Sequence, residues 1–285
     1  MQLEYSSLKV RVLRKPLRFF HITDCHLTQI TEEEALDERL KELAAKRTRH
    51  LTSITGQSPL QILDAQMEQA KKLDCDYVIM TGDIIDYTTE ANLSELKRVV
   101  RSTPVFYTLG NHDAYIPFRN CEELKKKNLS LVEACVGQSV DVNCRQVDEL
   151  LLVGINNADF QITKEQYRKV EEILQRGLPV LLCCHIPFYC DTFLEDTQEV
   201  WGAPILIGCP EDVYRARPTY RSVELTSNED TYAFVEMLKR ADNLVGIVAG
   251  HLHFSHTDMF TETKPQFVTA YSAGDVARVI ELVPQ

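Results

Sequence analysis

The chain has 285 residues, 44% of them hydrophobic, and a formal net charge of -11. This composition is enough to bury a sizeable core, which excludes a chain dominated by disorder. The acidic balance argues against a nucleic-acid partner, because binding to its phosphate backbone needs clustered Lys and Arg. The sequence shows no signal-like or membrane-spanning stretch, and its nine cysteines form no C-x-x-C pair. We therefore expect a cytoplasmic protein with reduced thiols.

Short apolar runs predict buried strands at residues 17–23, 77–81, 105–109, 150–155, 180–184 and 244–249. Helical periodicity between them predicts helices over residues 32–51, 59–73, 90–100 and 164–176. The last helix is marked by a capping box of Thr163 and Gln166 and by Gly177 after its end. Residues 253–283 are rich in strand-like segments, for which we expect a second sheet packed on the first. We therefore predict a layered α/β fold in a single domain over residues 1–285.

Polar side chains that can bind metals follow the ends of five predicted strands. They are Asp24, His26, Asp83, Asn111, His185, His251 and His253. Because loops at the carboxyl edge of an α/β sheet converge, we expect these side chains to be neighbours. Alternation along an extended chain would point Asp24 and His26 to one metal and Cys25 away from it, into the core. Carboxylate, amide and imidazole groups suit ions such as manganese, iron or zinc, and the donors do not select among them.

In this order the clusters resemble the five motif blocks of the calcineurin-like metallophosphoesterases. The blocks are Asp24-x-His26, Gly82-Asp83-x-x-Asp86, Gly110-Asn111-His112-Asp113, His185 and Gly250-His251-x-His253. The resemblance implies a four-layer α/β/β/α sandwich of two mixed sheets flanked by helices, with two divalent metal ions. It also implies the ligands: one ion on Asp24, His26 and His253, the other on Asn111, His185 and His251, and Asp83 bridging both through its two oxygens.

The same resemblance implies two catalytic residues. His112 would face the substrate, stabilising the transition state or protonating the leaving oxygen, and Asp86 would orient its imidazole. The alternatives are a histidine satisfied within a turn and a carboxylate that caps a helix or turn. We interpret Asp113 as structural.

The family hydrolyses phosphate esters of many kinds, so the fold does not select the substrate. Protein phosphatases of the family typically have Arg and Glu where this chain has Tyr87 and Asp113. Residues 21–27 and 184–187 are most similar to class III cyclic-nucleotide phosphodiesterases, so we predict a phosphodiesterase acting on a small, nucleotide-like substrate. The alternatives are a phosphomonoesterase or protein phosphatase, and a metal-free binding scaffold on this fold.

Residues 186–224 form a long connection, and such connections often act as lids or binding loops. The segment is therefore our candidate for an inserted substrate lid. It offers four aromatic side chains to stack on a base and two arginines for a phosphate: Tyr189, Phe193, Trp201, Tyr214, Arg215 and Arg217. Ordinary hydrophobic contacts of a lid are the alternative interpretation of the same residues.

Overall fold

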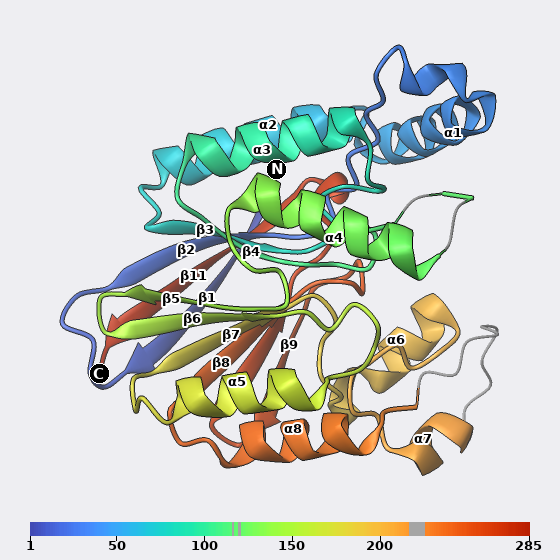
Figure 1. Cartoon of the computed structure of the whole chain (residues 1–285). Coiled ribbons are helices and arrows are strands. Elements are labelled where there is room, and N and C mark those ends of the chain that lie inside the picture. The colour runs from blue at the N-terminus through green and yellow to red at the C-terminus, as the bar shows by residue number, and fades with distance from the viewer. Residues whose placement is uncertain (116, 119–120, 217–225) are drawn as a thin grey trace.

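The computed structural model describes residues 1–115, 117–118, 121–216 and 226–285. These residues form two mixed β-sheets (Figure 1). The order of the first sheet is β1 (Gln2–Val10), β11 (Val276–Pro284), β2 (Leu17–Ile22), β3 (Tyr77–Thr81) and β4 (Val105–Thr108). The order of the second is β5 (Val142–Val147), β6 (Leu150–Ile155), β7 (Val180–Cys184), β8 (Leu244–Ala249), β10 (Lys264–Val268) and β9 (His256–Thr261).

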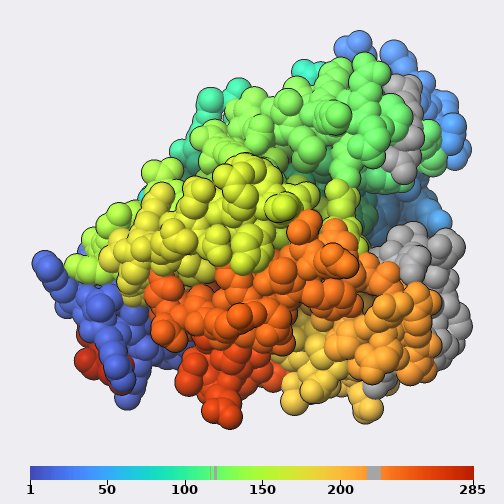
Figure 2. All heavy atoms as spheres, turned by 60° about the horizontal axis from the view of Figure 1, so that its bottom comes forward, coloured from blue at the N-terminus to red at the C-terminus, as the bar shows by residue number. Residues whose placement is uncertain are grey.

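Helices cover the outer face of each sheet. On the first sheet lie α2 (Pro59–Lys72), α3 (Glu90–Ser102) and α4 (Glu122–Val136), and on the second α5 (Lys164–Leu174) and α8 (Glu229–Arg240) (Figure 1). Helix α1 (Glu38–Thr55) lies to one side of this arrangement, and α6 (Leu194–Trp201) and α7 (Glu211–Ala216) follow β7. Figure 2 views the molecule from the side of α5 and α8. None of the helices in the described ranges is both long and apolar enough to cross a bilayer.

Three apolar cores, formed by the residues that the structure describes, separate the layers. The core between the sheets includes Phe19 and Ile79 from the first sheet and Leu181 and Val248 from the second. A second core lies between the first sheet and α2, α3 and α4, and a third between the second sheet and α5 and α8. The predicted four-layer α/β/β/α sandwich is thereby confirmed.

The predicted strands end within one residue of the observed ones, and the capping box at Thr163 and Gln166 is present. The expectation for the end of the chain was only partly correct. Strands β9 and β10 join the second sheet, but β11 lies in the first, parallel to β1 and antiparallel to β2. Within the described ranges there are also three short turns of 3-10 helix, at Glu34–Leu36, Asp191–Phe193 and Ser272–Gly274.

Candidate metal centre

The candidate ligands lie on loops that follow β2, β3, β4, β7 and β8 at one end of both sheets. Five of them have a left-handed backbone, with φ between 50° and 68°: Asp24, His26, Asp83, His251 and His253. The expected extended path through Asp24 and His26 was therefore wrong, because β2 ends at Ile22. Their N–H groups instead donate to the carbonyls of Gly82 and Asp83, which ties the two loops together. Non-glycine residues adopt this conformation at a cost, and such strain clusters at functional sites.

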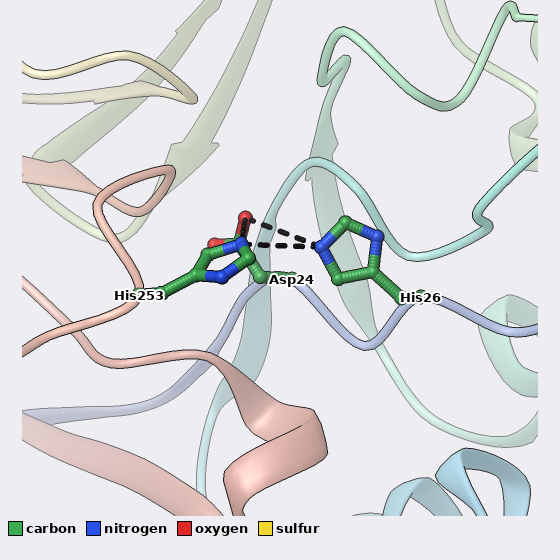
Figure 3. Close-up of side chains that lie close together, drawn as sticks. All are labelled: Asp24, His26 and His253. Atoms are coloured by element: carbon green, nitrogen blue, oxygen red, sulfur yellow. Dashed lines mark hydrogen bonds and ion pairs between the residues drawn. The ribbon is translucent and has the colours of Figure 1, made fainter. Parts of the chain in front are cut away.

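Asp24, His26 and His253 form the first cluster (Figure 3). The Nε2 atom of His253 lies 3.3 Å from Asp24 Oδ1 and 3.2 Å from His26 Nε2. Asp24 is fully buried, and its Oδ2 accepts from the Thr23 hydroxyl and the His251 N–H. Its Oδ1 has no hydrogen-bond donor among the described residues. A buried carboxylate oxygen without a donor, facing two imidazoles, suits a cation.

A second cluster surrounds His185. Its Nδ1 donates to the carbonyl of Thr81 at 2.7 Å, so in the neutral ring the lone pair is on Nε2. That Nε2 lies 3.2 Å from each of three atoms: Asp83 Oδ2, Asn111 Oδ1 and His251 Nδ1. Four atoms that can all donate a lone pair therefore converge on one place. This donor set fits a divalent ion that accepts both oxygen and nitrogen ligands.

Asp83 is close to both clusters, because ligand atoms of Asp83, of Asp24 in the first cluster and of His185 in the second all lie within 4.8 Å of one another. Its Oδ1 accepts the N–H of His112 at 2.7 Å, so Oδ2 is the oxygen that faces His185. The expected bridge through both oxygens stays a prediction, because an oxygen that accepts one hydrogen bond keeps a second lone pair for a metal. Burial disfavours the charged form of His185, but Asp83 and Asp24 outweigh it and raise the pKa of His185 to about 10. The negative field that favours an imidazolium here favours a metal cation as well.

Asp86 is nearly buried and is shared by two histidines. His26 Nδ1 donates to its Oδ1 at 2.9 Å, which leaves Nε2 of His26 to face the first cluster. His112 Nδ1 donates to the Asp86 carbonyl at 3.1 Å and lies 3.3 Å from Oδ1. Asp86 thus contacts His112, as expected, and also His26, which is a candidate metal ligand. Burial opposes the His112 cation, but Asp83 and Asp86 outweigh it and raise the pKa of His112 to about 9.

Asp113 has a structural role, as we interpreted it from the sequence. It is fully buried, and its carboxylate accepts the N–H groups of Asp83, Ile85 and Gly110. These contacts hold the loops after β3 and β4 against each other. Cys25 packs in the core under α2 and α3, as expected.

Two of the four aromatic residues proposed for stacking are placed differently from that hypothesis. Phe193 and Tyr214 are buried in the core beneath α8, so they have no face open to a base. Trp201 does reach the site: its ring lies edge-on to His253 at 5.1 Å, and its Nε1 donates to the Leu252 carbonyl. Arg217 and residues 218–224 lie outside the described residues.

Two residues beside the site gave no signal in the sequence. Tyr271 stacks on His253, with ring centroids 4.9 Å apart and planes 17° from parallel. Arg47, from α1, forms two hydrogen bonds to Asp86. Both come from segments far from the motif blocks, where no local pattern indicates a site.

A cavity of about 270 Å³ opens beside Asn111, between the loops after β4 and β6 and the start of α4. Tyr115, Asn128 and Asn156 contribute to its lining. Lys125 also lines it and forms an ion pair with Asp159 on the same wall. Leu109, Ala114, Leu124 and Ala158 are also part of the lining, so the cavity is of mixed polarity and its lysine is paired with an acidic residue.

The family model for calcineurin-like phosphoesterases matches residues 17–255, which include all seven candidate ligands. The chain belongs to this family. This calcineurin-like phosphoesterase is therefore a phosphoester hydrolase, of a family that depends on a dinuclear metal centre. We find no significant match among curated proteins.

Solved structures similar to this calcineurin-like phosphoesterase have low sequence identity. A dimetal phosphatase from Danio rerio is 12% identical, with 90% of this chain and 88% of that chain covered and a TM-score of 0.55. This likeness shows the shared fold. The protein TT1561 of Thermus thermophilus is 10% identical, with 90% of each chain covered and a TM-score of 0.49.

Proposed function

We propose that this calcineurin-like phosphoesterase is a single-domain phosphodiesterase that hydrolyses a small, nucleotide-like ester. Asp24, His26 and His253 would hold one ion, and Asn111, His185 and His251 the other, with Asp83 between them. One observation carries the proposal: buried oxygen and nitrogen acceptors converge here, and Asp24 Oδ1 has no donor among the described residues. The residues thus fit the metal pair on which the family depends.

When bound, the two ions would activate water and offset the charge of the phosphoryl oxygens. The chain itself orients the groups around them. His112 is 34% exposed, and its Nδ1 is held by Asp86, so Nε2 lies on the opposite edge of the ring. A proton held at that Nε2 would pass to the leaving oxygen of the ester. Thr81 and Asp86 fix the neutral tautomers of His185 and His26 that bind a metal through Nε2.

Two features support a small diester as the substrate. The cavity beside Asn111 has room for a compact group, and its charged residues, Lys125, Asp159 and Glu122, have no net positive charge to attract a further phosphate. On the other side of the centre, Trp201 and Tyr271 flank His253 with aromatic surface. A diester carries two groups on phosphorus, and these two sides of the centre offer a place for each.

The test compares bis-p-nitrophenyl phosphate with p-nitrophenyl phosphate, using chelated protein supplied separately with manganese, zinc and iron. We expect metal-dependent turnover that favours the diester. A preference for the monoester would replace the proposal with a phosphatase. Absence of turnover with every metal would favour the binding scaffold instead.

Two substitutions separate metal binding from proton transfer. Asp83→Asn should lose both metal and activity, because it removes the charge that faces both clusters. His112→Ala should keep its metal content while kcat falls by about 10²- to 10⁴-fold, the usual contribution of a general acid. His50→Ala, at an exposed position on α1, is the matched control and should change neither. Full activity in Asp83→Asn or His112→Ala would contradict these roles.

A further inference from the structure

Helix α1 buries little of itself. Of its 18 residues only Ala44 and Leu51 are buried, and Figure 1 shows the helix at the edge of the molecule. Its ends are well defined, because Asp37 accepts the N–H groups of Arg39 and Leu40 and the helix stops at Gly56. Helices in proteins owe most of their stability to apolar packing, and this one has little.

The side chain of Arg47 links α1 to the candidate centre. Arg47 donates from Nε to Asp86 Oδ2 at 2.8 Å and from Nη2 to Asp86 Oδ1 at 2.6 Å. The side chain of Asp86 is 4% exposed and that of Arg47 is 30% exposed, so the pair lies where the site meets solvent. Two parallel hydrogen bonds fix the plane of a carboxylate in a way that a single contact does not.

The consequences of this pair concern His26 and His112. Asp86 Oδ1 accepts from His26 Nδ1 and lies 3.3 Å from His112 Nδ1, whereas Arg47 supplies the hydrogen bond to Oδ2. Without Arg47, Oδ2 would lose that partner at a nearly buried position. The carboxylate could then rotate and exchange its two oxygens, and the orientation of both imidazoles would become less defined.

We propose that Arg47 is a positioning residue for phosphoester hydrolysis. It fixes Asp86, and Asp86 orients His26 toward the first cluster and His112 toward the substrate. The inference rests on the proposed function, since it assigns a role through those two histidines. In the alternative role, Arg47 would leave Asp86 and bind the substrate phosphate directly. That role would act on substrate affinity, whereas positioning acts on turnover.

The kinetic test compares Arg47→Ala and Arg47→Gln with Arg49→Ala, an exposed arginine on the same helix. We expect both Arg47 variants to lower kcat by about 10- to 100-fold, as loss of a partner behind a metal ligand does, with KM changed less than about threefold. Added methylguanidinium should restore part of the activity of Arg47→Ala. A raised KM with unchanged kcat, or no change in either, would overturn the proposal. Arg49→Ala should match the wild type.

A second readout does not depend on activity. In chelated protein labelled with ¹⁵N-histidine, the Nδ1 protons of His26 and His112 should give slowly exchanging, downfield resonances. Arg47→Gln should broaden or shift both, and Arg49→Ala neither. Unchanged resonances in Arg47→Gln would contradict the proposal even if its activity were reduced. Wild-type protein that hydrolyses no ester with any metal would refute the proposed function, while these resonances would still test whether Arg47 fixes Asp86.

Discussion

His21 should make the protein sensitive to acid. It is fully buried in β2, between the hydroxyls of Thr81 and Thr269, each 2.7 Å from a ring nitrogen. Burial, aided by the positive charge of Arg278, lowers its pKa to about 3, against an ordinary value of about 6.5. Between these values the unfolded chain binds a proton that the folded chain excludes. The free energy of unfolding therefore falls as pH decreases from 6.5, by about 2 kcal/mol at pH 5.

The assay is urea unfolding of chelated protein at pH 7 and pH 5, for wild type and for His21→Gln. Chelation matters because metal binding depends on pH in its own right. Since the glutamine does not titrate, the loss of stability between the two pH values should be about 2 kcal/mol smaller in His21→Gln. His50→Gln, on exposed α1, should show the wild-type loss. An equal loss in His21→Gln and wild type would show that His21 does not cause the sensitivity to acid.

Two further predictions concern the loop after β8 and its neighbour. A Cβ at Gly250 would overlap Thr23 Oγ1 and Asp24 Oδ2. We therefore expect Gly250→Ala to lower the free energy of unfolding by about 1–3 kcal/mol and to weaken metal binding, as measured by urea unfolding and metal titration. Tyr271→Ala removes the ring stacked on His253 and should raise the manganese concentration needed for half-maximal activity, whereas Tyr271→Phe keeps the ring and should not. Equal manganese dependence in the two Tyr271 variants would contradict a role for the stack.

Much of the fold was predictable because its inner strands are uninterrupted apolar runs. Strand β7, Val180–Cys184, is buried at every position, and a run of this kind has few alternatives to a central strand. Strand β1 was not predicted, since it is largely exposed and pairs with β11, at the opposite end of the chain. The helix predicted over residues 32–51 instead begins after Asp37 and continues to Thr55. Its start depends on which of several acidic residues caps it.

The placement of the candidate ligands at one end of the sheets was predictable, because each lies within four residues of the end of a strand whose position the apolar pattern defines. Their backbone conformation was not predictable, since contacts between loops impose it. The backbone N–H of Asp24 donates to the carbonyl of Gly82, and that of His26 donates to the carbonyl of Asp83. Arg47 could not be found from its neighbours in sequence. In the sequence it is one of several charged residues of its helix, and only the position of α1 in the fold brings it to Asp86.

The most direct test of the account is to measure bound metal and activity on the same samples of chelated protein as manganese is added. If the seven residues hold the ions on which hydrolysis depends, activity should rise with bound metal and level off at two ions per chain. Asp83→Asn should bind less manganese and stay inactive throughout the titration. Full activity in wild-type protein that retains no metal would contradict the account.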